Sequence, residues 1–172
     1  MNFSDWLELN ESSLNDILKS TINAFPNTSK RQYATNPIKI VKLNWSPFPG
    51  MNTLFVRAIA QNEGREYNPL ILFKKVNYSK DGISLVANDG KKYDLKPMSS
   101  KENDILLRCN CGDFYWRGNY ADHLDHSLYG KKRKKYKSLG IGPPANPENT
   151  PMMCKHLIKL TKVLKEAGIL TS

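Results

Sequence analysis

The three cysteines of this 172-residue chain fall into two closely spaced ligand pairs, the second completed by a histidine. Cys109 and Cys111 are separated by one residue, and Cys154 stands two positions before His156. Residues two apart on a strand point to the same side, so both thiols of the first pair can bind one ion. Three thiolates and one imidazole satisfy a tetrahedral zinc ion and leave no coordination position open. The sequence therefore predicts one structural zinc site that ties together two distant segments.

Two other interpretations of these residues stay open. Free cysteines are often buried as ordinary small core residues, without a metal. His123 and His126 lie three positions apart, as neighbours on a helix do, and could replace His156. Together with Asp122 and Asp125 they could instead bind a second metal ion, although such histidines are more often solvated or bonded to acidic neighbours.

The order of the two pairs, Cys-x-Cys and then Cys-x-His, resembles the SWIM zinc finger. Phe114 follows the second cysteine, and the second pair opens a helix. The 42 residues between Cys111 and Cys154 exceed the usual gap, but the cost of closing a loop grows slowly with its length. The wider pattern Cys-x-Cys-x-Asp-Phe-x-x-Arg, then Asn146-Pro147 and Cys-Lys-His-Leu, is similar to small virion structural proteins of tailed bacteriophages. This resemblance implies a virion structural protein with a zinc-bound module.

Patterning divides the chain into three predicted segments: a helical head or arm at 1–30, a mainly β domain at 31–104 and the zinc-binding module at 105–172. In the head, apolar residues recur three or four positions apart, which predicts a helix that Ser12 or Ser13 caps and Pro26 ends. Its expected apolar face comprises Leu14, Ile17, Leu18, Ile22 and Phe25. This helix would dock on its own domain or pack as an arm on a neighbouring subunit.

A polar linker at residues 27–37 precedes segments with the period-two pattern of strands. The expected strands are 38–45, 53–60, 67–76, 83–86, 92–95 and 105–108, with Asn88-Asp89-Gly90 marking a hairpin. A second amphipathic helix spans residues 154–167, and Gly168 is its expected C-terminal cap. Its apolar face comprises Leu157, Leu160, Leu164 and Ala167. The predicted fold class is α+β: an N-terminal helix, a mainly antiparallel sheet and a zinc-bound C-terminal module that ends in a helix.

Part of the net charge of +10 is concentrated in the long insertion between the ligand pairs. Six of the seven residues at 131–137 are basic: Lys131, Lys132, Arg133, Lys134, Lys135 and Lys137. Such a run suits nucleic-acid phosphates or an acidic subunit, and it equally describes a solvated loop. Five aromatic residues lie near the first cysteine pair, and we expect them to form a core around the zinc rather than to stack on bases. They are Phe114, Tyr115, Trp116, Tyr120 and Tyr129.

The sequence contains no phosphate-binding glycine loop, no nucleophile elbow and no cysteine beyond the predicted ligands, so no catalytic residues are predicted. We expect a non-enzymatic, zinc-stabilised assembly protein, a tailed-phage virion component at a head, neck, tail or baseplate junction. Its expected partners are neighbouring subunits of a complex, with no small-molecule substrate. The alternative is an intracellular nucleic-acid-binding SWIM zinc-finger protein.

The expected location follows from two further features of the sequence. No apolar run reaches the roughly 20 residues that cross a bilayer, and the start lacks the charged and apolar regions of a signal peptide. With no export signal, the thiols are expected to stay reduced. We therefore expect the virion as the location, after synthesis in a host cytoplasm, or the cytoplasm in the alternative, and no membrane partner.

Overall fold

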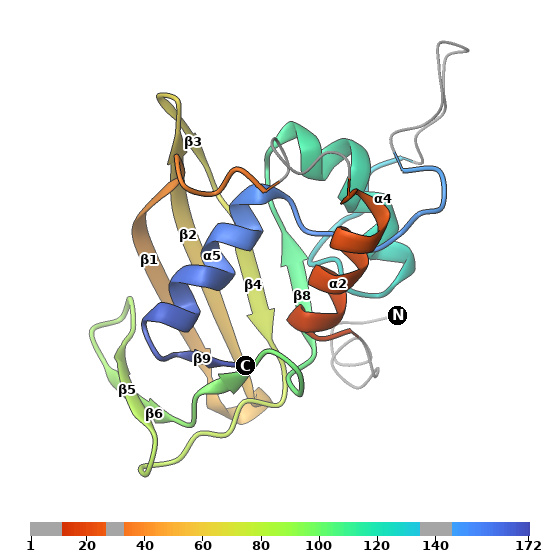
Figure 1. The fold of residues 1–172 in the computed structure, drawn as a ribbon. Coiled ribbons are helices and arrows are strands. Elements are labelled where there is room, and N and C mark those ends of the chain that lie inside the picture. Colours follow the sequence, from red (N-terminus) through yellow and green to blue (C-terminus); the bar gives the residue numbers. More distant parts are fainter. Residues whose placement is uncertain (1–11, 27–32, 135–145) are drawn as a thin grey trace.

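A computed structural model describes residues 12–26, 33–134 and 146–172 of the chain. Its centre is a five-stranded antiparallel sheet with the strand order β1-β2-β4-β8, in which β3 also pairs with β2. Helix α5 (Lys155–Glu166) lies across one face of this sheet (Figure 1). The strands are β1 (Lys39–Phe48), β2 (Thr53–Asn62), β3 (Arg65–Tyr67), β4 (Leu70–Phe73) and β8 (Ile105–Arg108). The α+β class predicted from the sequence is confirmed.

Strand β1 extends three residues beyond its predicted end at residue 45. Pro47 pairs with Leu54 of β2, and a proline is tolerated there because β1 is an edge strand that needs no N–H on its open side. The turn follows as the short 3-10 helix η2 (Pro49–Met51), and Asn52 enters β2 with a left-handed φ of 53°.

The predicted single strand at residues 67–76 is wrong, because the segment forms two strands. Pro69 has no N–H group to donate to a ladder, so β3 ends before it and β4 begins after it. The Pro69 carbonyl still accepts a hydrogen bond from the Ala58 N–H at 3.1 Å, which keeps both strands against β2. Strand β4 ends at Phe73, and Lys75 has a left-handed φ of 57° that ends the extended conformation.

Helix α2 (Leu14–Ala24) begins at the predicted cap and docks on its own chain. The Ser13 hydroxyl accepts from the Asp16 N–H at 3.3 Å, and the Asp16 carboxylate accepts from the Ser13 N–H at 3.1 Å, a reciprocal capping box. Its fully buried residues are Leu14, Ile17 and Thr21. Ile22, which we placed on the apolar face, is 47% exposed, because the buried face follows the i, i+3, i+7 positions through Thr21 instead.

Helix α5 ends as the sequence predicts. Gly168 has φ 76°, its N–H bonds the Lys165 carbonyl, and the Ile169 N–H bonds the Leu164 carbonyl, which together form a Schellman motif. Leu157, Leu160 and Leu164 are buried, but Ala167 is exposed because it is already the C-terminal cap. The chain then adds β9 (Leu170–Thr171), which pairs in parallel with β7 (Met98–Ser99), two strands that the sequence did not indicate.

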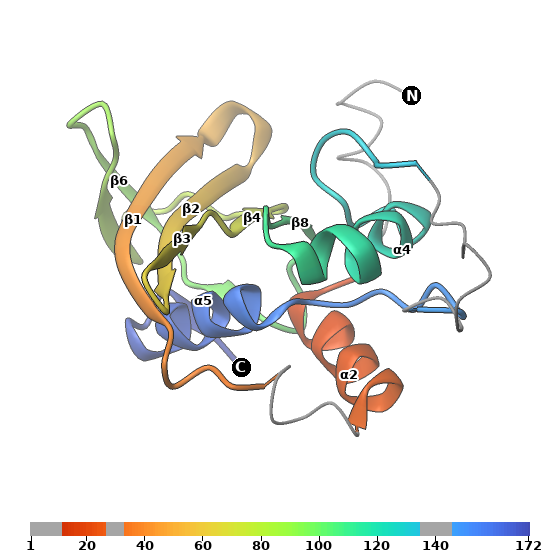
Figure 2. The ribbon, with the colours of Figure 1, turned by 90° about the horizontal axis from the view of Figure 1, so that it is seen from above.

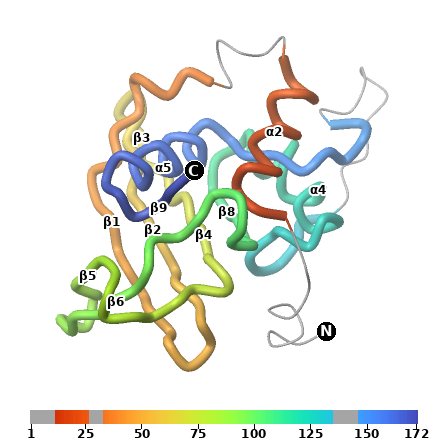
Figure 3. Tube along the Cα trace, turned by 60° about the horizontal axis from the view of Figure 1, so that its bottom comes forward, coloured from red at the N-terminus to blue at the C-terminus, as the bar shows by residue number. Residues whose placement is uncertain are grey.

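The predicted hairpin of β5 (Ile83–Val86) and β6 (Lys92–Leu95) is present, with Gly90 at φ 80° in its turn. This hairpin lies at the far end of the molecule from helix α4 (Asn119–Leu124) (Figures 1 and 3). A continuous apolar core includes residues from all three predicted segments, among them Leu14, Leu54 and Leu157. None of the helices within the described ranges has the length and apolar character needed to cross a membrane.

Candidate metal centre

The first ligand pair lies where the chain leaves the sheet. Strand β8 pairs with β4 as far as Arg108, opposite Leu70, and Cys109 is already beyond the ladder. The expectation that both thiols sit on one strand is therefore wrong. The intervening Asn110 fixes this corner instead, since its side-chain oxygen accepts a hydrogen bond from the Asn68 N–H at 2.8 Å. Asn68 lies next to Pro69, between β3 and β4, where the ladder is interrupted. The Asn68 N–H is therefore available to donate to Asn110 in the ligand loop.

Cys111 starts the helical part of the insertion. The Phe114 N–H donates to the Cys111 sulfur at 3.3 Å, and the Tyr115 N–H donates to the Cys111 carbonyl at 3.0 Å. A five-residue π-helical turn, η3 (Phe114–Gly118), follows and continues into α4. An N–H donor to a thiolate is a common feature of metal-bound cysteines because it offsets negative charge on the sulfur.

The second ligand pair lies where the chain enters α5. Cys154 is the N-terminal cap residue of α5, and His156 lies in the first turn. The extended segment before them is fixed on both sides. The Met153 N–H donates to the Thr21 hydroxyl of α2 at 3.0 Å, and the Met152 N–H donates to the Asp122 carboxylate of α4 at 2.8 Å. Figure 2 shows α2 and α4 beside the segment that leads into α5.

Four ligand atoms converge at this point, all within 4.8 Å of one another. The Nδ1 atom of His156 lies 3.9 Å from the sulfur of Cys109 and 3.9 Å from that of Cys154. A sulfur and a nitrogen bound to one tetrahedral zinc ion are about 3.5 Å apart, given bonds of about 2.3 and 2.0 Å. The cluster of Cys109, Cys111, Cys154 and His156 can therefore bind one metal ion with little movement.

Burial makes this cluster unfavourable for free ionised thiols. Its four side chains are 4%, 4%, 0% and 2% exposed in chain order. The three cysteines are free rather than disulfide-bonded. Burial raises the pKa of the Cys154 and Cys109 thiols, whereas hydrogen bonds from those two thiols lower the pKa of Cys111. One thiolate can be shared among the three sulfurs, but full ionisation of all three in this setting needs a cation.

The imidazole of His156 is oriented by packing. Its ring stacks on that of Tyr67 with centroids 4.3 Å apart and an interplanar angle of 29°. The Nε2 atom is buried and has no hydrogen-bond partner among the described residues. The ring therefore directs Nδ1 toward the sulfurs through the stacking contact with β3, a contribution of Tyr67 that no sequence motif indicated.

The other candidate histidines do not join a metal cluster. Within the described ranges, the four residues above form the one group of three or more such side chains close enough to hold an ion. His126 takes a left-handed φ of 61° just after α4. Asp122 turns inward to accept the Met152 N–H, so neither histidine replaces His156 and no second site forms with Asp122.

The residues of the wider sequence pattern form one structural network around the cluster. Phe114 is fully buried, and Arg117 forms an ion pair with Asp113 one helical turn earlier. The Asn146 side chain donates to the carbonyls of Arg117 and Thr150 at 2.9 and 2.8 Å and accepts from the Thr150 N–H at 3.1 Å. Each of these positions therefore holds the insertion in shape.

The aromatic residues of the insertion divide between the core and the surface. Phe114 is buried, but Tyr115 and Trp116 are 47% and 51% exposed. The expectation that these aromatics together form a core around the metal is therefore wrong for Tyr115 and Trp116, because only Phe114 and Gly118 of η3 are buried. Of the basic run, residues 131–134 are described, and Lys135 and Lys137 lie outside the described residues.

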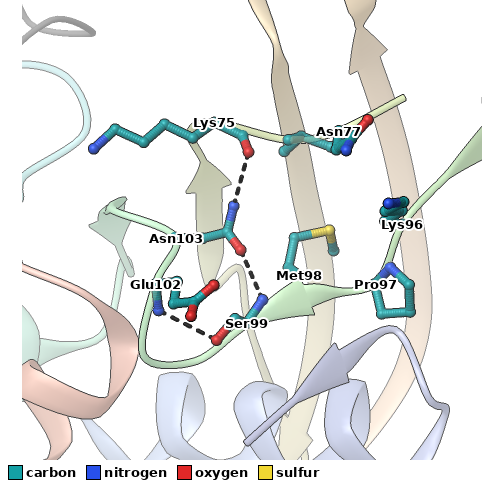
Figure 4. A pocket seen from close by; sticks show the side chains of 9 residues that line it. Lys75, Asn77, Lys96, Pro97, Met98, Ser99, Glu102 and Asn103 are labelled. Atoms are coloured by element: carbon teal, nitrogen blue, oxygen red, sulfur yellow. Dashed lines mark hydrogen bonds between the residues drawn. The ribbon is translucent and has the colours of Figure 1, made fainter. Parts of the chain in front are cut away.

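A pocket of about 380 Å³ lies away from the cluster, beside β7 (Figure 4). Its polar groups are bonded mainly to each other. The Asn103 side chain accepts from the Ser99 N–H at 2.7 Å and donates to the carbonyls of Lys74 and Lys75 at 2.8 and 3.2 Å, while the Glu102 N–H donates to the Ser99 hydroxyl. These contacts fix the turn after β7, so the pocket is not assigned as a functional site.

The buried carboxyl of Asp122 predicts a pH dependence of stability. Burial raises its pKa well above the ordinary value, and nearby Asp125 adds to the rise. The folded state thus binds this proton more tightly than the unfolded state does. Its contribution to stability is present below the ordinary carboxyl pKa and is lost as the pH rises toward the raised value.

Asp122→Asn keeps an acceptor for the Met152 N–H but cannot ionise. We expect the variant to become progressively more stable than the wild type as the pH rises from 5 toward 8, by about 1 kcal/mol or more at the upper end. Urea unfolding at a series of pH values, with Asp81→Asn at an exposed position as the matched control, measures this difference. A difference between wild type and Asp122→Asn that does not change with pH would contradict the assignment.

No family model, curated protein or solved structure matches this chain. The class that the site defines is therefore stated from its geometry alone: an α+β protein with a buried Cys₃His cluster that can hold one metal ion, compatible with a zinc finger.

Proposed function

We propose that the metal is zinc and that its role is structural. Three soft sulfur ligands and one imidazole suit zinc, whereas calcium and magnesium prefer oxygen ligands. All four tetrahedral positions would be filled by Cys109, Cys111, Cys154 and His156, which leaves none for water or substrate. The ligand order supports a SWIM-type finger with a long insertion.

The single observation that carries the proposed function is where the cluster sits. Its ligands come from the segment between β8 and η3 and from the cap and first turn of α5, so one ion would clamp the sheet, the insertion and the helix together. The described residues between the ligand pairs, 112–134 and 146–153, would then be held as one shaped element for recognition. We infer that the protein is a non-enzymatic assembly component that binds neighbouring subunits through this insertion.

The proposed setting is the virion of a tailed bacteriophage, at a head, neck, tail or baseplate junction. Support comes from the similarity of residues 109–117, 146–147 and 154–157 to small phage virion proteins. It also comes from the structural roles of those same residues. They include the four ligands of the cluster, the buried Phe114, the Asp113–Arg117 ion pair and Asn146, which bonds the Arg117 carbonyl. A protein whose distinctive residues all maintain shape suits assembly better than catalysis.

Sedimentation tests the assembly role. The epitope-tagged full chain, made in cells that produce the virus, is expected to sediment with purified particles at a fixed ratio to the other virion proteins. A matched chain with Arg117→Ala should show reduced incorporation, because it loses the Asp113 ion pair and loosens the insertion. Purified particles that lack the wild-type chain would overturn the proposal.

The alternative function is nucleic-acid binding through the basic run. One observation favours it: the described part of the run is held in a fixed conformation. The Arg108 guanidinium donates to the Lys131 carbonyl at 2.9 Å, and the Asn119 side chain accepts from the Arg133 N–H at 2.8 Å. A solvated loop needs no such contacts.

A further inference from the structure

Exposed aromatic rings and basic side chains meet on one surface of the insertion. We call it the aromatic–basic surface and define it by Tyr115, Trp116, Lys131, Lys132, Arg133 and Lys134. Tyr115 and Trp116 are 47% and 51% exposed, and the three lysines are exposed as well. Large aromatic side chains are usually mostly buried. Two adjacent exposed rings next to a basic segment therefore indicate a binding surface.

The two rings are held rather than loose. They pack edge to face with centroids 4.9 Å apart, and the Arg133 guanidinium lies 5.6 Å from the centre of each. The same guanidinium donates to the backbone carbonyls of Tyr115 and Trp116, the latter at 2.9 Å. Arg133 therefore joins the basic segment to η3 and fixes the ring faces before any ligand binds, which lowers the entropic cost of binding.

The basic segment is fixed at its other end by the sheet. Leu107 of β8 bonds both sides of Leu128: its N–H donates to the Ser127 carbonyl at 2.7 Å, and its carbonyl accepts from the Tyr129 N–H at 2.9 Å. Arg108 then donates to the carbonyls of Tyr129 and Lys131 at 3.0 and 2.9 Å. The lysine side chains are thus presented from a backbone held at residues 129, 131 and 133.

Charge balance favours a polyanion. Six basic and three acidic side chains occur between Arg108 and Lys134. Of the acidic ones, Asp122 is fully buried, Asp113 pairs with Arg117 and Asp125 is half-buried, so at most one partly exposed carboxylate offsets the charge of the exposed lysines. One lysine, Lys132, also lies 5.8 Å from the centre of the Tyr120 ring, which places a cation beside a further aromatic face.

We propose that the aromatic–basic surface binds single-stranded nucleic acid, with bases stacking on Tyr115 and Trp116 and phosphates contacting Lys131, Lys132 and Lys134. Stacking needs an unpaired base face, which a duplex does not offer, and a purely acidic protein surface has no use for the rings. The inference rests on the proposed metal clamp, because the first residue of η3, Phe114, is bonded to the Cys111 sulfur, but not on a virion role.

The test is fluorescence anisotropy with a labelled oligodeoxythymidylate of about 15 nucleotides, within the range of single-strand site sizes. Trp116→Ala is expected to weaken binding by about 10-fold or more, with Trp116→Phe restoring most of it. Phe48→Ala is the matched control, since Phe48 is 44% exposed at the β1 end of the sheet, and it should bind as the wild type does.

Salt dependence tests the phosphate contacts separately. Lys131→Ala/Lys132→Ala should make the slope of log affinity against log salt shallower by about 1.4, because each lysine releases about 0.7 counterion from a single strand. Lys91→Ala/Lys92→Ala, in the exposed β5–β6 hairpin, should leave the slope unchanged. A duplex of the same length is expected to bind more weakly than the single strand.

Three outcomes overturn the proposal. The first is that metal-loaded protein does not bind the oligonucleotide at low salt. The second is that duplex and single strand bind equally. The third is that Trp116→Ala binds like the wild type while polyglutamate competes fully. The last would assign the surface to an acidic protein. Failure of the metal clamp is distinguishable, because it would appear as metal-free protein that still folds, whatever it binds.

Discussion

Cys111→Ser is expected to release the metal and to lower the free energy of unfolding by about 5 kcal/mol or more. A serine hydroxyl is neutral at pH 7 and a poor zinc ligand, and in small metal modules the binding energy of the ion is also folding energy. Ordinary substitutions cost about 0.5–3 kcal/mol, so an effect above 4–5 indicates loss of a structural group. Elemental mass spectrometry should find about one zinc per wild-type chain and none in the variant, and denaturant unfolding should give the stability difference.

The chelator-treated wild type is the matched control for this variant. It should unfold at about the same denaturant concentration as Cys111→Ser, and the variant itself should not respond to the chelator. A Cys111→Ser protein that keeps one equivalent of metal would contradict the ligand assignment. Retention of zinc by Cys154→Ser/His156→Ala would show that the second ligand pair lies elsewhere.

Phe114→Ala is expected to cost about 3–5 kcal/mol in unfolding free energy while the metal stays bound. The ring is fully buried between η3 and the core, and its removal leaves a cavity that the surrounding structure fills only in part. Packing here is close: a Cβ added at Gly118 would lie 2.9 Å from Phe114 Cδ2. Denaturant unfolding with parallel metal analysis measures both effects.

Tyr115→Ala, one position later, is the matched control for this second variant. Its ring is 47% exposed, so we expect a cost below about 1 kcal/mol, from the lost contacts to Trp116 and Arg133. Equal costs for the two variants would mean that η3 is not inserted into the core in solution. Phe114→Ala that loses its metal as well would mean that Phe114 also holds Cys111 in place.

These predictions separate two parts of one motif. The ligands Cys109 and Cys111 are followed by a buried Phe114, and then by two exposed rings, within eight residues of sequence. The metal and the buried ring would make the turn rigid, and the exposed rings, held by Arg133, would then present their faces for recognition. A change in the first part should therefore affect mainly stability, and a change in the second should affect mainly binding.

Local chemistry made much of this fold readable from the sequence. A serine at position 12 or 13 indicated the start of α2, Gly168 indicated the end of α5, and strand β8 ended where the cysteines began. The ligand set was visible because three cysteines in two spaced pairs carry a chemical meaning that does not depend on the rest of the chain. Errors arose where a single residue, such as Pro69, altered a local pattern.

Tertiary structure decided what local pattern does not encode. No periodicity indicates that Tyr67 orients His156, that Asp122 and Thr21 fix the segment before Cys154, or that Asn110 bonds Asn68. Each of these contacts joins residues far apart in the chain.

The exposure of Tyr115 and Trp116 was likewise decided by the tertiary structure. A sequence shows that a residue is aromatic, but only the way η3 packs on the core decides which ring faces water. The sequence by itself thus determined the chemistry of the metal ligands, because ligand type is a property of the residue. The tertiary structure alone determined their common centre and the surface beside it, because burial and orientation depend on contacts between distant segments.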